Sequence, residues 1–243
     1  MDGWYLPNAY RRRIILESFP KTSTRKTILD AGCSIGYMYL KLVNRGYEVL
    51  GVDANDDFKF TSESLPSEYA SRLSYVQGDL ENLSLRDSLF DGIICVDVLE
   101  HIHDDVSVVT SFYQALKSGG VLVLHVPSID GMKEFVGARD LEVRKGKEDL
   151  RAHFRDGYEV EQAVTLLMQA GFSEIVTFHT FTRATQLSYL LDGHRFRQIV
   201  FFLPFRIAMR LQSYLKDSRP YARSDFQGIM IRAKKTTRVD STK

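Results

Sequence analysis

Cysteines and long apolar runs are both scarce in this chain of 243 residues. The only two cysteines, Cys33 and Cys95, cannot supply a disulfide framework, which indicates a reducing compartment. The N-terminus lacks the continuous apolar stretch of a signal peptide and carries Arg11-Arg12-Arg13 instead. These absences predict a cytoplasmic protein. We expect the three arginines to form a solvated helix face, with a phosphate contact as the alternative.

Net charge and internal repetition are also lacking. The chain has 32 basic and 31 acidic residues, so nothing draws the whole molecule toward nucleic acid, and no nucleic-acid partner is expected. No repeat is visible, and 44% hydrophobic residues can fill one core. We therefore expect a single domain over residues 1–243.

A strand, a turn of small residues and a helix follow one another near the start of the chain. The strand covers about 27–29, the turn 30–36, and the helix ends at Gly46. A second strand, 48–52, leads into Asp53. In a βαβ unit, a carboxylate there can accept hydrogen bonds from both ribose hydroxyls of a nucleoside lying across the first turn. The pattern predicts a nucleoside site.

The turn lacks two of the three glycines that a dinucleotide requires. With Gly32 as the first, Ser34 and Tyr37 stand where the second and third belong, and Asp30 would repel a diphosphate. A nicotinamide oxidoreductase is therefore disfavoured. A cationic ligand without phosphates fits better, and S-adenosylmethionine is such a ligand.

Five segments in order resemble motifs of the class I S-adenosylmethionine-dependent methyltransferases, over roughly residues 25–180. They begin at Asp30, Asp53, Gln77, Phe90 and Leu116. The resemblance extends to the small-molecule methyltransferases of the type 11 and ubiquinone-biosynthesis kind. It implies a methyltransferase that uses S-adenosylmethionine as its cofactor. The cofactor-binding residues that it implies are Asp30, Gly32, Cys33, Gly36, Asp53, Ala54, Asp79, Leu80, Asp97 and Leu99.

Alternating strand and helix signals predict an α/β fold, a Rossmann-like doubly wound sheet. Strands are expected at 27–30, 48–53, 73–77, 91–96, 121–126, 172–181 and 227–232, and helices near 35–45, 55–65, 104–118 and 159–170. The resemblance implies seven strands in the order 3-2-1-4-5-7-6, with the seventh antiparallel. Residues 127–158 and 182–225 are expected to be substrate-side insertions, and 234–243 a disordered tail.

Histidines near the ends of the later strands are the candidate catalytic residues. A base is needed only for an acceptor such as a hydroxyl, and His153 and His125 are the two candidates, although local packing remains an alternative for each. Glu100, His101, His103 and Asp104 form a cluster that we interpret as companions of a helix N-terminus and not as metal ligands. No metal is expected.

An apolar segment interleaved with arginines, 195–215, lies inside the second insertion. It is too short and too charged to span a bilayer. It could cover the acceptor as a lid, form a dimer contact, or lie on a membrane surface. The sequence thus predicts O-methylation of a small or lipid-linked molecule by a monomer or homodimer. A non-catalytic module that binds the same cofactor is the alternative.

Overall fold

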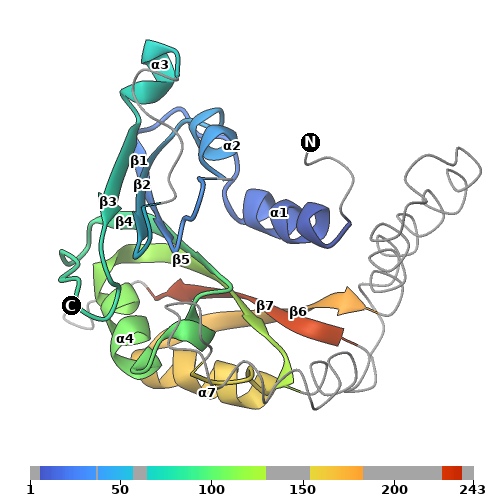
Figure 1. The fold of residues 1–243 in the computed structure, drawn as a ribbon. Helices are drawn as coiled ribbons and strands as arrows, with labels where there is room; N and C mark the ends of the chain where they lie inside the picture. Colours follow the sequence, from blue (N-terminus) through green and yellow to red (C-terminus); the bar gives the residue numbers. More distant parts are fainter. Residues whose placement is uncertain (1–5, 37, 57–64, 130–153, 183–225, 237–243) are drawn as a thin grey trace, which may run out of the picture.

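A seven-stranded sheet forms the centre of the computed structural model, which describes residues 6–36, 38–56, 65–129, 154–182 and 226–236. The strand order is β3-β2-β1-β4-β5-β7-β6 (Figure 1). The first five strands are parallel, whereas β7 runs antiparallel to both β5 and β6. The strands are β1 (Lys26–Ala31), β2 (Tyr47–Asp53), β3 (Leu73–Gln77), β4 (Phe90–Val96), β5 (Leu116–Pro127), β6 (Phe172–Thr182) and β7 (Phe226–Lys235). The expected fold class, strand order and antiparallel strand are confirmed.

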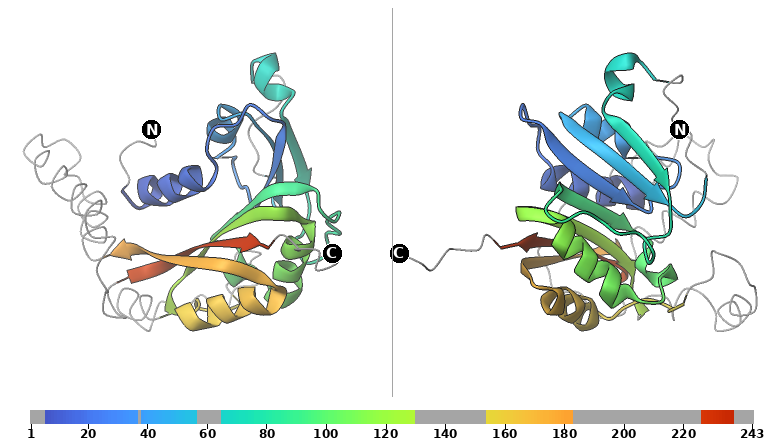
Figure 2. Two further views of the ribbon diagram at one scale, coloured as in Figure 1. Left: turned by 180° about the vertical axis from the view of Figure 1, so that it is seen from behind. Right: turned by 90° about the vertical axis from the view of Figure 1, so that its left-hand side faces the viewer.

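Helices cover both faces of this sheet (Figure 2). One face carries α1 (Leu6–Ser18) and α2 (Tyr39–Val43), and the other carries α4 (Asp105–Ala115) and α7 (Val160–Ala170). Two short elements, α3 (Ser67–Ala70) and η1 (Leu99–His101), complete the described part. The expected cap of α7 is confirmed, because Gly171 has a left-handed φ of 103°.

Successive residues of the central strands face opposite sides of the sheet and fill two apolar clusters. In β5, Leu122 and Leu124 join the cluster under α4 and α7, whereas Val123 joins the cluster under α1 and α2. His125 follows Val123 in this alternation and therefore lies on the α1 side. This placement brings His125 to the face on which the candidate site is built.

Three element boundaries differ from those expected. Helix α4 ends at Ala115, three residues early, because β5 begins at Leu116 and contains an irregularity at Gly119, whose φ is 76°. Helix α2 spans only Tyr39–Val43 and is therefore shorter than the helix expected near 35–45. Strand β7 continues to Lys235, so residues 234 and 235 pair within the sheet and do not belong to a tail.

Most of both expected insertions lies outside the described residues, which exclude 130–153 and 183–225. The segment 195–215 and His153 are therefore not placed, and neither is most of the helix expected over 55–65. Among the described helices, none is both long and apolar enough to cross a membrane.

Candidate functional site

The turn after β1 is the first component of the site. Gly32 and Gly36 have left-handed φ values of 77° and 79°, and Ser34 adopts 46°. A Cβ atom on Gly32 would lie 2.1 Å from Cγ2 of Val98, so glycine is required where this turn meets the loop after β4. Ile35, at the tip of the turn, is 46% exposed. The backbone of this turn thus lies at the edge of the sheet, with its tip exposed to solvent.

Asp53, at the end of β2, ties that turn to the neighbouring strand. Its Oδ2 accepts the backbone N–H of Ser34 at 2.7 Å, and its Oδ1 accepts the N–H of Asn55 at 2.9 Å. The N–H of Gly78 donates to the Asp53 carbonyl at 2.8 Å, which places the end of β3 beside it. The carboxylate therefore stands where it was expected, at the edge of the turn.

Asp30 and Cys33 form the buried base of the turn. Burial, followed by the charge of Asp53, raises the pKa of Asp30 to about 7. Burial also raises the pKa of the Cys33 thiol to about 12, with smaller contributions from Asp30 and Asp53. A thiol held neutral in this way is a packing group and a poor nucleophile.

The segment after β3 carries two more of the predicted cofactor-binding residues, Asp79 and Leu80. Asp79 accepts the N–H of Glu81 at 3.0 Å and the side-chain amide of Asn82 at 2.8 Å, so its own turn holds it. Leu80 is half-buried and Ala54 is exposed. These residues lie at the same edge of the sheet as the turn after β1.

Asp97, just beyond β4, is held from two sides. Its Oδ1 lies 2.5 Å from Nδ1 of His125, and its Oδ2 forms an ion pair with the Arg11 guanidinium of α1. The other ring nitrogen of His125 lies 2.8 Å from Oγ1 of Thr180. Burial acts to raise the pKa of Asp97, but the attraction of His125 and Arg11 outweighs it and holds that pKa well below its usual range.

Glu100, on η1, is a buried carboxyl group. The residue is 3% exposed, and among the described residues its Oε2 has no hydrogen-bond partner. Burial, followed by the charge of Asp97, raises the pKa of Glu100 to about 8. Two carboxyl groups three residues apart therefore differ in charge at neutral pH, with Asp97 ionised and Glu100 protonated.

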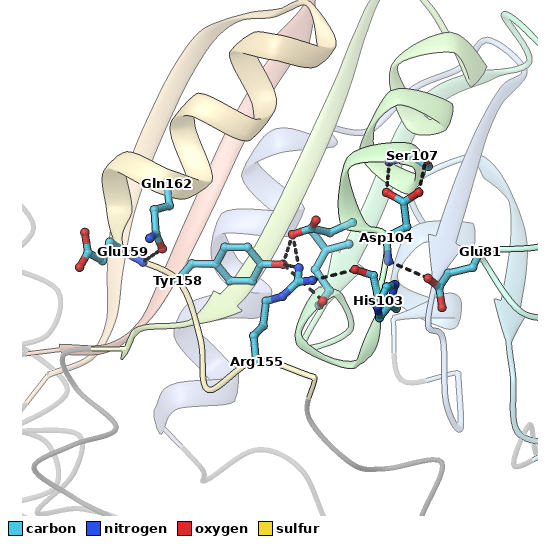
Figure 3. Close-up of polar contacts among 10 residues, drawn as sticks. Glu81, His103, Asp104, Ser107, Arg155, Tyr158, Glu159 and Gln162 are labelled. Carbon is cyan, nitrogen blue, oxygen red and sulfur yellow. Dashed lines mark hydrogen bonds and ion pairs between the residues drawn. The ribbon is translucent and has the colours of Figure 1, made fainter. Parts of the chain in front are cut away.

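A polar cluster fastens the chain at 154–158 to the loop after β4 (Figure 3). Arg155 donates to the carbonyl of His103 at 3.0 Å and to the Tyr158 hydroxyl at 2.6 Å, and it pairs with Asp105. Tyr158 donates to Asp105 at 2.8 Å. The N–H of Phe154 donates to the Glu100 carbonyl at 2.8 Å. The C-terminal end of the first insertion is therefore fixed beside Glu100.

Some predicted site residues have other surroundings than expected. Leu99 is fully buried in the core under α4 and α7, because η1 turns it inward, so it presents no surface to a ligand. His125 is 2% exposed, with both ring nitrogens near protein oxygens. Asp104, by contrast, caps α4 through the N–H of Ser107 at 3.0 Å, as expected of a companion of that helix N-terminus. In the part of the chain that is described, no three potential metal ligands are grouped.

The structure gives Arg11 other surroundings than expected, and it adds Thr180 and Gly228, which the sequence did not single out. Arg11 was expected on a solvated face, but its side chain is 14% exposed and paired with Asp97, so that expectation is wrong. Thr180 gave no signal. Gly228, inside β7, could have been noticed, because a glycine in a strand often marks a close approach.

Comparison with known families agrees with this geometry. Residues 29–124 match the family of the methyltransferase domain. Ubiquinone biosynthesis O-methyltransferase of Nitrosomonas europaea is 31% identical over 98 residues, which cover 40% of this chain and 42% of that protein. The enzyme of the same name from Rickettsia canadensis is 28% identical over 107 residues, covering 44% of each. The chain thus spans less than half the length of these curated relatives.

Solved structures share the fold over nearly the whole chain. Phosphoethanolamine N-methyltransferase 2 of Haemonchus contortus, in complex with S-adenosyl-L-methionine, has a TM-score of 0.64 at 19% identity and covers 94% of this chain and 53% of that one. A SAM-dependent methyltransferase from Archaeoglobus fulgidus has a TM-score of 0.60 at 19% identity and covers 95% and 93%. The match over residues 29–124 and the shared fold thus agree with the resemblance to S-adenosylmethionine-dependent methyltransferases that the sequence motifs indicate. The expected cofactor, S-adenosylmethionine, is the ligand bound in the Haemonchus contortus structure.

Proposed function

We propose that the protein transfers the methyl group of S-adenosylmethionine to a hydroxyl of a small or lipid-linked acceptor. The observation that carries the proposal is the placement of Asp53, whose carboxylate stands against a turn that lacks a phosphate cradle. Ribose hydroxyls can donate to this carboxylate, and nothing in the turn favours a diphosphate over a cation.

The electrostatics of the described site favour a positively charged ligand. Asp53 and Asp97 present carboxylates at the edge of the sheet, and the side chain of Asp97 is 43% exposed. S-adenosylmethionine supplies a methyl group on a sulfonium, which an acceptor displaces in line. The protein's task is then to hold the donor and acceptor collinear and dry, which can supply roughly 7–11 kcal/mol.

We propose oxygen as the atom that accepts the methyl group, because the relatives named above are ubiquinone biosynthesis O-methyltransferases. A hydroxyl acceptor benefits from a base. His153 keeps that role as a hypothesis, although it lies outside the described residues, whereas both ring nitrogens of His125 already contact protein.

The segment 195–215 remains a candidate for lid, dimer contact or membrane contact. It combines an apolar run, including four phenylalanines, with four flanking and interleaved arginines, a composition typical of segments that lie on anionic bilayers. Sedimentation with anionic and neutral liposomes tests this contact. Salt-sensitive binding to anionic vesicles that weakens in Arg206→Glu would support the membrane contact, whereas no binding by a monomer would leave a lid.

Calorimetric titration with S-adenosylmethionine, S-adenosylhomocysteine, NAD and ATP tests the cofactor site. We expect the first two to bind and the last two to bind far more weakly. Asp53→Ala should weaken binding by roughly 1.5–3 kcal/mol, the value of hydrogen bonds to a charged group. Asp87→Ala, at an exposed carboxylate of a loop, is the matched control and should bind like the parent. Equal binding by Asp53→Ala would refute the assignment.

A panel of acceptors tests the reaction. Catechol, a prenylated catechol, phosphoethanolamine and histamine would each be incubated with S-adenosylmethionine, and the formation of S-adenosylhomocysteine and of a methylated product would be followed by mass spectrometry. Methylation of the catechols supports O-methylation. Methylation of the amines alone would contradict the choice of oxygen. Tight cofactor binding without any methylated product, including from cell extracts, would favour the non-catalytic module.

A further inference from the structure

We propose that Arg11 and His125 are positioning residues that aim the Asp97 carboxylate at the amino group of the cofactor's methionine portion, so that helix α1 belongs to the cofactor site. The inference rests on the proposed function, because it assumes that S-adenosylmethionine lies across the turn after β1. It assigns a role to Arg11 on α1, His125 on β5 and Thr180 on β6. None of these three residues belongs to the predicted set of cofactor-binding residues.

A continuous line of polar contacts connects three elements to Asp97. Arg11 reaches it from α1, His125 reaches it from β5 at 2.5 Å, and Thr180 of β6 holds the far nitrogen of His125 at 2.8 Å. His125 and Thr180 are 2% and 1% exposed. A buried imidazole engaged at both nitrogens has a fixed ring plane, so its Nδ1–H has a fixed direction.

The carboxylate keeps capacity for a ligand after these contacts. An ionised carboxylate has about four acceptor positions, and Arg11 and His125 use one on each oxygen. The side chain is 43% exposed. A positive φ of 56° at Asp97, uncommon for a residue with a side chain, turns the chain sharply beyond β4. Asp97 is therefore held in place while part of it faces solvent.

A glycine makes room for the buried pair. A Cβ atom on Gly228 of β7 would lie 2.6 Å from Nε2 of His125 and 2.4 Å from Oγ1 of Thr180. Distances this short force one of the two groups to move. The contact between His125 and Thr180 thus requires a glycine at position 228 of the adjacent strand. This requirement supports the contact independently of the hydrogen-bond distances.

Two ligands separate positioning from general damage to the fold. S-adenosylhomocysteine carries the amino group, whereas 5′-methylthioadenosine keeps the adenosine and lacks the whole amino-acid portion. Calorimetry on the full chain would give the affinity ratio of the two. His125→Phe should lower the affinity for S-adenosylhomocysteine by about tenfold and leave that for methylthioadenosine nearly unchanged. His125→Asn, whose amide can replace Nδ1–H, should retain most of the ratio.

Arg11→Gln tests the contribution of α1 and should lower the same ratio, because one oxygen of Asp97 loses its partner. Arg13→Gln is the matched control, since Arg13 pairs with Glu17 of its own helix at 2.7 Å and lies two residues further along α1. The ratio in that control should equal the parent's.

The outcomes distinguish the two proposals. If the parent protein binds neither ligand, the proposed function fails. If the parent binds S-adenosylhomocysteine more tightly than methylthioadenosine, and His125→Phe and Arg11→Gln leave the ratio unchanged or raise it, the positioning role is overturned and the proposed function stands. A parallel loss of both affinities in the variants would also overturn it, because that pattern indicates a structural defect.

Discussion

Replacing Glu100 with glutamine should change the pH dependence of stability in a defined direction. The pKa of this buried carboxyl rises from 4.5 to about 8 on folding, first because of burial and then because of Asp97. A raised pKa means that the folded state holds the proton more tightly. The contribution of Glu100 to stability is therefore complete below pH 4.5 and is lost as the pH rises through about 8.

The size of the effect follows from the shift. Each pKa unit corresponds to 1.36 kcal/mol. A single group moving from 4.5 to about 8 costs the parent about 2.5 kcal/mol of unfolding free energy between pH 6 and pH 9. Glu100→Gln cannot ionise and lacks this cost. Its stability relative to the parent should rise by that amount over the interval, even if the amide is less stable by a constant at every pH.

Urea denaturation of both proteins at several pH values, followed by circular dichroism, measures this difference. Other groups that titrate, Asp30 among them, are present in both proteins and cancel in the comparison. Glu68→Gln, at an exposed position of α3, is the matched control and should run parallel to the parent. Parallel curves for Glu100→Gln and the parent would show that Glu100 does not titrate as a buried group, and the reasoning would fail.

Three further predictions concern the site and its surroundings. His153→Ala should lower turnover and leave cofactor affinity unchanged, which steady-state kinetics and calorimetry would measure; loss of both would indicate a structural role. Gly32→Ala should abolish cofactor binding, because its Cβ would lie 2.1 Å from Val98 at a φ of 77°, and titration would detect this. Arg155→Ala should lower the melting temperature by several degrees, since Asp105 and Tyr158 lose a shared partner; an unchanged value in scanning calorimetry would contradict this.

Local patterns predicted the parts of the fold that depend on neighbours in the sequence. Gly171 ends α7 and Asp104 begins α4 as their residue types suggest. The end of α4 was misjudged because the sequence 116–120 reads as a helix end and tight turn, whereas the backbone at Gly119 allows pairing with β4 to begin at Leu116. Leu116 pairs with Phe90 of β4, and no local sequence pattern indicates that these two residues meet.

Parts of the candidate site could not be predicted because their contacts join residues that are far apart in the sequence. Asp53 and the turn after β1 form one motif, so their contact follows from spacing. Arg11 and Asp97 are separated by 86 residues, and His125 and Thr180 by 55. A run of arginines on a helix is usually solvated, and only the fold reveals that one of them meets a carboxylate.

The position of β7 in the sheet has a consequence for folding. Among the described strands, β7 comes last in sequence, yet it lies inside the sheet, where it pairs with β5 on one side and β6 on the other. Until residues 226–235 arrive, β5 exposes one unpaired edge and β6 lacks its partner strand in the described sheet, and unpaired edges are sites of aggregation. His125 and Thr180 stand on those two strands, so their contact depends on a late, long-range closure of the sheet. A nascent chain that ends before β7 would contain the turn after β1 and Asp53, but it would lack the contact between His125 and Thr180 that holds Asp97 in place.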